Sequence, residues 1–435
     1  TGFGQAVKDI SMKGIFMEKS LKKDIIINRL PVVIYFILIF AALMVIISAV
    51  APMSNHEPKT TDTYSDFSTG WLNCEESEAS LDHLSGTTVI HRTITAADCN
   101  KTLFFFAKTS NIKVFIDGVC QYRNNHFCSQ FFGKTPGALF VNVLIPAESD
   151  GKLLEIEIEN PYKDDDSAKL DEMYIGDISD IIQFQQQKRF NSFCISFIIM
   201  VLGVVMLLLF IPLTRQKIVG IEFLNLGVTA FVSGLYLTTD GRYLQLVFGD
   251  AHIYHVIAET ALRLSILPFL IFLSQMYESY SKRISAILCV IGEIAFAGCF
   301  IGEITEIMDY HETLFLVHVV FAISMLFILV STIKGIVKAP KENIYHNIGC
   351  IVLSFMAMTD IIILWRGTGR ETSYFIRLGI LIFFFMEIVQ IIKKFLASYQ
   401  RNIKNELLNA IEKNEFTLVM VYHKRICPIF SFIII

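Results

Sequence analysis

Charged side chains stand inside apolar segments of this chain, where they are rare and usually functional. Glu259 and Arg263 are four residues apart, so a helix would place both on one face, with Glu N-terminal to Arg, the favourable order for an ion pair. An unpaired charge at membrane depth costs several kcal/mol. The pair is therefore predicted to face the interior of a helical bundle, with Asp360 as a second partner for Arg263.

Glu293 and His318 extend this set of polar positions in apolar segments. The predicted intramembrane polar network thus comprises Glu259, Arg263, Glu293, His318 and Asp360. Two interpretations stay open: a ligand or signalling pocket in the bundle, or a structural network that fixes the order of the helices, which we favour. A membrane enzyme or transporter that uses Glu259, Arg263 and Asp360 is the alternative function, although the sequence shows no internal repeat of the kind common in transporters.

Long apolar segments provide the elements that must position these residues. Each is close to the ~20 residues that a helix needs to cross the hydrocarbon core. With 53% hydrophobic and only 18% charged residues, the chain of 435 residues is too apolar for an ordinary soluble fold. The seven expected spans that follow one another are 193–213, 218–238, 253–275, 284–302, 313–333, 347–365 and 375–394.

The predicted fold is a membrane α-helical protein, with one N-terminal anchor helix and a seven-helix bundle, that carries an inserted extracellular all-β sandwich. An uncleaved anchor is favoured over a cleaved signal peptide because its apolar core exceeds the ~7–15 residues of a signal sequence. We expect translation to start at Met17. The expected divisions are a cytoplasmic tail at 1–30 (1–16 not native), the anchor at 31–50, the sandwich at 55–185, the bundle at 190–395, a helical stalk at 396–415, and a truncated or aberrant tail at 416–435.

The distribution of Lys and Arg between the loops predicts the orientation. If both termini are cytoplasmic, the cytoplasmic loops are the basic ones and the opposite loops carry only Arg242, Arg366 and Arg370. Residues 51–188 are then extracellular and the protein is a multi-pass cell-membrane protein. The basic residues on the cytoplasmic side are Arg215, Lys217, Lys282, Arg283, Lys334, Lys338, Lys341, Lys393, Lys394, Arg401 and Lys404.

Short alternating runs between residues 60 and 187 predict about eight strands in a sandwich or barrel. The clearest are Thr102–Ala107, Asn111–Ile116, Ala138–Ile145 and Leu153–Glu159, and Asp117-Gly118 supplies a tight hairpin turn. Four cysteines in this domain allow three disulfide pairings, with free thiols as the alternative. No cysteine or histidine spacing indicates a metal site. The four cysteines are Cys74, Cys99, Cys120 and Cys128.

The order of the strand-like segments in this domain resembles that of the galactose-binding-like jelly rolls of bacterial membrane sensors. The segments that carry the resemblance are Trp71, Leu103-Phe104-Phe105-Phe106, Val114–Gly118, Phe140–Pro146, Leu154–Ile158 and Tyr174–Asp177. Followed by seven helices, it is similar to the seven-transmembrane receptors with diverse intracellular signalling modules. The resemblance covers about residues 31–400. It implies an external small-molecule or carbohydrate ligand and an intracellular output domain, a diguanylate cyclase of the GGDEF type that makes cyclic-di-GMP, or a histidine kinase.

Aromatic and polar residues near strand ends are the candidate contacts for such a ligand, because sugar rings are held by stacking plus a few polar groups. For Trp71 and the Phe cluster, however, the favoured interpretation is that they fill the sandwich core. The tentative extracellular ligand-binding residues are Trp71, Tyr122, His126 and Tyr162.

After the last span, apolar positions recur at heptad-like spacing: Ile392, Leu396, Tyr399, Ile403, Leu407 and Ala410. This stripe predicts a stalk continuous with the membrane helix, through which the protein forms a homodimer; a surface amphipathic helix is the alternative. No catalytic motif is present, so no catalytic residue or cofactor is expected and the output enzyme is predicted to be missing from this chain. Net charge is −4 without a basic cluster, so besides the ligand and membrane lipid we expect no nucleic-acid partner.

Overall fold

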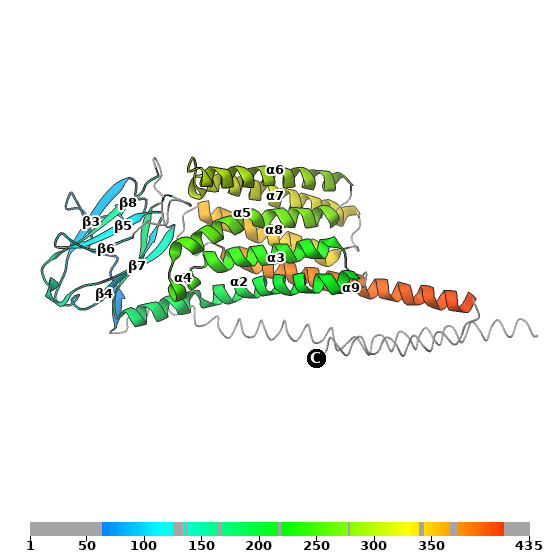
Figure 1. Cartoon of the computed structure of the whole chain (residues 1–435), viewed down its shortest axis with the longest axis horizontal. Helices are drawn as coiled ribbons and strands as arrows, with labels where there is room; N and C mark the ends of the chain where they lie inside the picture. Colours follow the sequence, from blue (N-terminus) through cyan, green and yellow to red (C-terminus); the bar gives the residue numbers. More distant parts are fainter. Residues whose placement is uncertain are drawn as a thin grey trace, which may run out of the picture.

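The computed structural model describes residues 63–124, 134, 137–162, 168–215, 219–276, 279–338, 343–365 and 373–412. The expected N-terminal tail, the anchor at 31–50, and the tail at 416–435 lie outside the described residues, as do His126 and Cys128. Figure 1 shows a β-domain at one end of a bundle of long helices, with the last helix projecting from the opposite end.

Two antiparallel sheets form the β-domain. One has the order β1-β9-β4-β7 and the other the order β2-β3-β8-β5-β6. The strands are β1 (Tyr64–Asp66), β2 (Leu72–Asn73), β3 (Thr87–Thr93), β4 (Thr102–Lys108), β5 (Asn111–Ile116), β6 (Val119–Arg123), β7 (Ala138–Leu144), β8 (Leu153–Glu159) and β9 (Lys169–Gly176), with a short 3-10 helix η2 (Ala147–Ser149) before β8.

The strand predictions at β4, β5, β7 and β8 are confirmed to within about one residue. Alternate side chains of both sheets, such as Phe105 on β4 and Ile156 on β8, enter one shared core, so the two sheets pack face to face as a sandwich. Asp117 and Gly118 have φ of 51° and 74° and turn β5 back into β6, as the Asp-Gly sequence predicts. Cys74, Cys99 and Cys120 are free thiols.

The bundle follows the sandwich without a linker. β9 ends at Gly176 and α2 begins at Ile178, where the carboxylate of Asp177 accepts the backbone N–H of Ser179 at 2.8 Å and caps the helix. This helix therefore begins well before the apolar segment expected at 193. The helices are α2 (Ile178–Arg215), α3 (Ile221–Asp240), α4 (Tyr243–Phe248), α5 (Ala251–Met276), α6 (Ser279–Ile304), α7 (Tyr310–Lys338), α8 (Ile344–Trp365) and α9 (Tyr374–Glu412).

Seven of the described helices, all but the short α4, are long and apolar enough to cross a membrane. Large apolar side chains point outward from them, including Leu208, Ile294 and Phe315, each more than two-thirds exposed. In water such a surface would be costly, whereas hydrocarbon chains are its natural surroundings. The protein is therefore an integral membrane protein of the multi-pass type.

Small residues let α2 and α3 approach closely. A Cβ added at Gly234 would lie 2.4 Å from the backbone nitrogen of Met200, and one at Gly203 would lie 2.3 Å from that of Phe231. Because the obstacle is backbone rather than a flexible side chain, a larger residue can be accepted only if the helices separate.

We expect Gly234→Val to destabilise the protein in detergent by about 1–3 kcal/mol, the usual cost of overpacking. The matched control is Gly298→Val on α6, where an added Cβ meets nothing within 4 Å. Thermal unfolding of the two variants measures the difference. Equal melting temperatures would contradict the close approach of α2 and α3.

Candidate functional site

The β-domain meets the bundle at the first turn of α7, which is built as a capping box. The Asp309 carboxylate accepts the backbone N–H of Glu312 at 3.0 Å, and the Glu312 carboxylate accepts the backbone N–H of Asp309 at 2.9 Å. Each carboxylate thus satisfies one of the donors that a helix N-terminus leaves unpaired. One oxygen of each remains available for other partners.

The β-domain uses those remaining oxygens. Tyr162, which follows β8, donates its hydroxyl to Oδ2 of Asp309, and the same oxygen accepts the backbone N–H of Lys134 at 3.2 Å. The Lys134 ammonium contacts Oε1 of Glu312 at 2.6 Å. The Tyr162 ring also packs against the His311 ring, with centroids 4.4 Å apart and planes tilted by 38°. Asp309 and Glu312, which cap α7, therefore also bind the β-domain.

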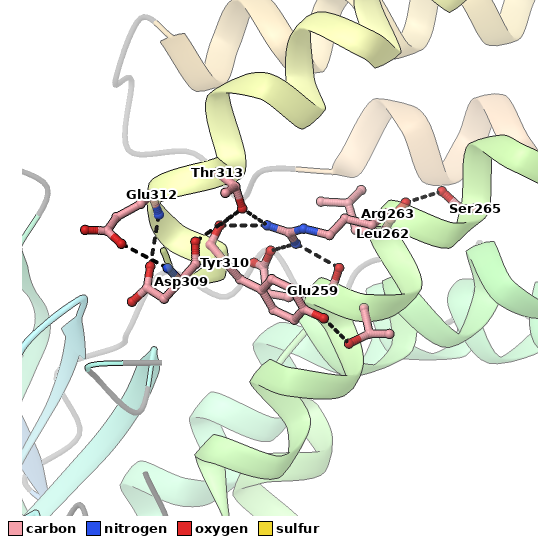
Figure 2. A network of polar contacts seen from close by, with 9 residues as sticks. Glu259, Leu262, Arg263, Ser265, Asp309, Tyr310, Glu312 and Thr313 are labelled. Atoms are coloured by element: carbon pink, nitrogen blue, oxygen red, sulfur yellow. Dashed lines mark hydrogen bonds and ion pairs between the residues drawn. The ribbon is translucent and has the colours of Figure 1, made fainter. Parts of the chain in front are cut away.

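Arg263 of α5, in the helical bundle, contacts the same first turn of α7. Its guanidinium donates to the carbonyl of Tyr310 at 2.6 Å and to Oγ1 of Thr313 at 3.1 Å, and it lies 4.1 Å from the centre of the Tyr310 ring. On its own helix it pairs with the Glu259 carboxylate at 2.6 Å. Figure 2 shows the first turn of α7, with Asp309, Tyr310 and Thr313, next to Arg263 and Glu259 of α5.

A continuous polar path thus runs from the sandwich into the bundle: Tyr162 to Asp309, across the first turn of α7, and through Arg263 to Glu259. We call the residues Lys134, Tyr162, Asp309, Tyr310, Glu312, Thr313, Glu259 and Arg263 the junction. The Arg263 side chain is 1% exposed, so its charge depends on these partners.

Asp360, expected as the second partner of Arg263, is bound elsewhere. Its carboxylate accepts the backbone N–H groups of Ile376 at 2.6 Å and Phe375 at 3.4 Å at the start of α9. The expectation was wrong because the first turn of α9 supplies unpaired N–H donors that attract a carboxylate. The Tyr310 carbonyl takes the second position on Arg263 instead.

The other polar positions in the bundle are separate from the junction or at its edge. Glu293 accepts a weak hydrogen bond from the Cys289 thiol of its own helix at 3.6 Å. His318 lies on α7, close enough to Glu259 and Arg263 for their charges to act on it. Of the five residues predicted as one network, Glu259 and Arg263 therefore form an ion pair and His318 lies near it. Glu293 and Asp360 have other partners.

A second ionic contact ties the sandwich to α2. Glu172 of β9 pairs with Arg189 at 2.7 Å and Lys188 at 2.8 Å. The Arg189 side chain is 4% exposed, and its guanidinium also lies 4.9 Å from the centre of the Phe140 ring. Burial opposes ionisation of Glu172, but the two positive charges prevail and lower its pKa to about 2.

The predicted sugar-binding residues do not share one environment. Trp71 is 1% exposed in the sandwich core, where Nε1 donates to the Phe67 carbonyl at 2.8 Å, so it fills the core and does not face a ligand. Tyr122 packs at the edge of that core on β6. Tyr162 is buried against α7 and serves the junction.

No protein-family model, curated protein or solved structure matches the chain significantly.

One part of the junction has a signal in the sequence. Asp309-Tyr310-His311-Glu312 places two acidic residues three apart just before an apolar run, which is the spacing of a capping box. Tyr162 and Lys134 carry no such signal, because their partners are about 150 to 180 residues further along the chain.

We expect Tyr162→Phe and Asp309→Asn each to destabilise the protein by about 1.5–3 kcal/mol, the usual value for a hydrogen bond to a charged group. The double variant should lose less than the sum, since both changes remove the same bond. Equilibrium unfolding in detergent measures all four proteins, with Tyr122→Phe as the matched control at within ~0.5 kcal/mol of wild type. Additive losses would show that Tyr162 and Asp309 do not interact.

Proposed function

We propose that this protein is a membrane receptor: the β-domain senses an external ligand, and the junction passes its state to the seven-helix bundle. The observation that carries this proposal is the double use of Asp309 and Glu312, which cap α7 and hold the β-domain at the same time. A shift of Tyr162 or Lys134 changes the electrostatics of the first turn of α7, and Arg263 responds through the Tyr310 carbonyl.

The resemblance to seven-transmembrane receptors with a jelly-roll sensor supports the same function. The two-sheet sandwich followed directly by the helices agrees with that architecture, and an external small molecule or carbohydrate is the ligand class it implies. α9 continues past its apolar part to Glu412 and projects about 27 Å at 1.5 Å per residue. We assign this extension the role of a dimeric stalk that leads to a separate output domain, such as a diguanylate cyclase.

The proposed orientation places the β-domain outside the cell and the far end of α7 in the cytoplasm. In a background in which the exposed native thiols Cys74 and Cys120 are replaced by serine, a cysteine introduced at the exposed Glu148 on η2 should react with a membrane-impermeant maleimide in intact cells. One introduced at Val337, 78% exposed near the end of α7, should react only after permeabilisation. The opposite pattern would invert the topology.

A saccharide screen tests the sensing role on the protein in nanodiscs. A ligand at 100 times its dissociation constant should stabilise the folded protein by ~2.7 kcal/mol. Uptake of the same compound into proteoliposomes separates the two function classes. A receptor binds without accumulating the compound inside, whereas accumulation would establish the transporter that Glu259, Arg263 and Asp360 suggest as the alternative.

A further inference from the structure

A carboxyl group stands in the middle of the outer side of α6. The apolar part of this helix runs from Lys282 to Ile304, and Glu293 lies midway between these ends. At 1.5 Å per residue each end is about 16 Å away, so Glu293 is near the centre of a hydrocarbon core about 30 Å thick. The sequence predicts Glu293 inside the bundle, whereas the structure exposes it on the bundle surface.

A carboxyl group at that depth normally faces the interior of a bundle, because lipid chains offer it no hydrogen-bond partner. Among the residues that the structure describes, the Glu293 carboxyl contacts one polar group. This is the thiol of Cys289, one turn earlier on α6, which lies 3.6 Å from Oε1. A thiol is a weak donor and leaves most of the hydrogen-bonding capacity of the carboxyl unused. Glu293 therefore needs a partner from outside the described bundle.

The residues around Glu293 form a stripe suited to helix packing. Of the seven described spans, α6 has the smallest buried share, so this surface has room for another helix. Exposed residues recur along it every three or four positions, and two of them are alanines, which let a second helix approach closely. We call this set the α6 stripe: Ala286, Val290, Glu293, Ala297 and Ile301.

A second copy of the chain matches the α6 stripe by symmetry. Copies of one membrane protein insert in the same orientation, so Glu293 of each lies at the same depth. A two-fold axis along the membrane normal then brings the two stripes and the two carboxyl groups together. A protonated carboxyl both donates and accepts a hydrogen bond, so two Glu293 side chains can satisfy each other without placing a charge in the membrane.

We propose that the α6 stripe is a homodimer interface in which the two Glu293 carboxyl groups hydrogen-bond to each other. This interface is separate from the stalk, since α6 and α9 lie on opposite sides of the bundle (Figure 1). Pairing through α6 therefore leaves the stalk surface of each copy accessible. The interface depends on the membrane part of the chain and does not require the receptor function.

Disulfide cross-linking of the full chain in membranes tests the interface, in a background in which the cysteines outside the spans are replaced by serine. Oxidation should link the Val290→Cys protein into dimers. Ile291→Cys is the matched control, because Ile291 is nearly as exposed as Val290, 48% against 53%, but points away from the stripe. Since successive helical residues are rotated by about 100°, we expect roughly fivefold less dimer from Ile291→Cys or lower still.

Equal yields of dimer from Val290→Cys and Ile291→Cys would overturn the proposal. So would the absence of dimers from both proteins, which is the result expected if the apolar segment 31–50 of the same chain covers α6. The parent protein without an introduced cysteine measures the background of the assay.

Variants of Glu293, combined with Ala297→Cys, test the self-pairing. Glu293→Gln still donates and accepts, so cross-linking should stay within about twofold, whereas Glu293→Leu does neither and should lower it roughly tenfold. Loss of cross-linking in Glu293→Gln as well would indicate an ionised Glu293 paired with a basic group and would overturn the self-pairing. Unchanged cross-linking in Glu293→Leu would also overturn it.

Discussion

Arg263→Ala should destabilise the protein by about 3–5 kcal/mol, the usual cost of removing one partner of a buried ion pair. The substitution strands the Glu259 carboxylate at membrane depth and leaves the Tyr310 carbonyl without the donor that lies 2.6 Å away. Equilibrium unfolding of the purified protein in detergent measures the loss.

Two further variants separate the contributions. Arg263→Ala combined with Glu259→Gln should recover part of the loss, because the stranded charge is removed as well. Arg263→Lys keeps the charge but cannot donate to Glu259, the Tyr310 carbonyl and Thr313 together, so we expect an intermediate stability. Wild-type stability in Arg263→Ala would show that the pair contributes nothing and would remove the membrane half of the junction.

Glu172→Gln should cost up to about 3 kcal/mol at neutral pH, the equivalent of lowering a carboxyl pKa from 4.5 to about 2. Since the pKa is lower in the folded protein, the stabilisation is complete above about pH 4.5 and disappears as the pH falls through about 2. The stability difference between wild type and Glu172→Gln, measured by thermal unfolding from pH 7 down to pH 2.5, should therefore shrink progressively below pH 4.5.

Glu157→Gln provides the matched control for this series. Glu157 pairs with Lys113 at 2.6 Å on the sandwich, but both side chains are more than a quarter exposed, so the pair should contribute less than about 1 kcal/mol. A difference for Glu172→Gln that stays constant from pH 7 to pH 2.5 would show that Glu172 is not ionised against Arg189 and Lys188.

Local sequence patterns predicted the parts of the fold that depend on neighbours along the chain. Alternation located β4, β5, β7 and β8, Asp117-Gly118 located a hairpin, and the helical spacing of Glu259 and Arg263 indicated the ion pair that the structure contains. The start of α2 was missed because its first turns are polar and pack on the sandwich, which no hydropathy pattern reports.

The contacts of the junction that join distant segments are not encoded in any local pattern. Tyr162 was a candidate sugar contact, yet its hydroxyl is bound by Asp309. Asp360 was assigned to Arg263 on charge alone, whereas backbone donors at the start of α9 are nearer to it. Each of these outcomes is decided by tertiary packing between distant segments.

The most direct test of the receptor proposal is hydrogen exchange across the junction in nanodiscs, comparing wild type with Tyr162→Phe. If the β-domain is coupled to the bundle through the cap of α7, removing one hydroxyl from the β-domain should accelerate exchange in residues 309–315 and in residues 259–265 of α5. Loss of a hydrogen bond worth about 1.5–3 kcal/mol corresponds to roughly tenfold or more, with residues 346–360 of α8 unchanged. Faster exchange confined to residues 63–176, with α5 and α7 as in wild type, would contradict the proposal.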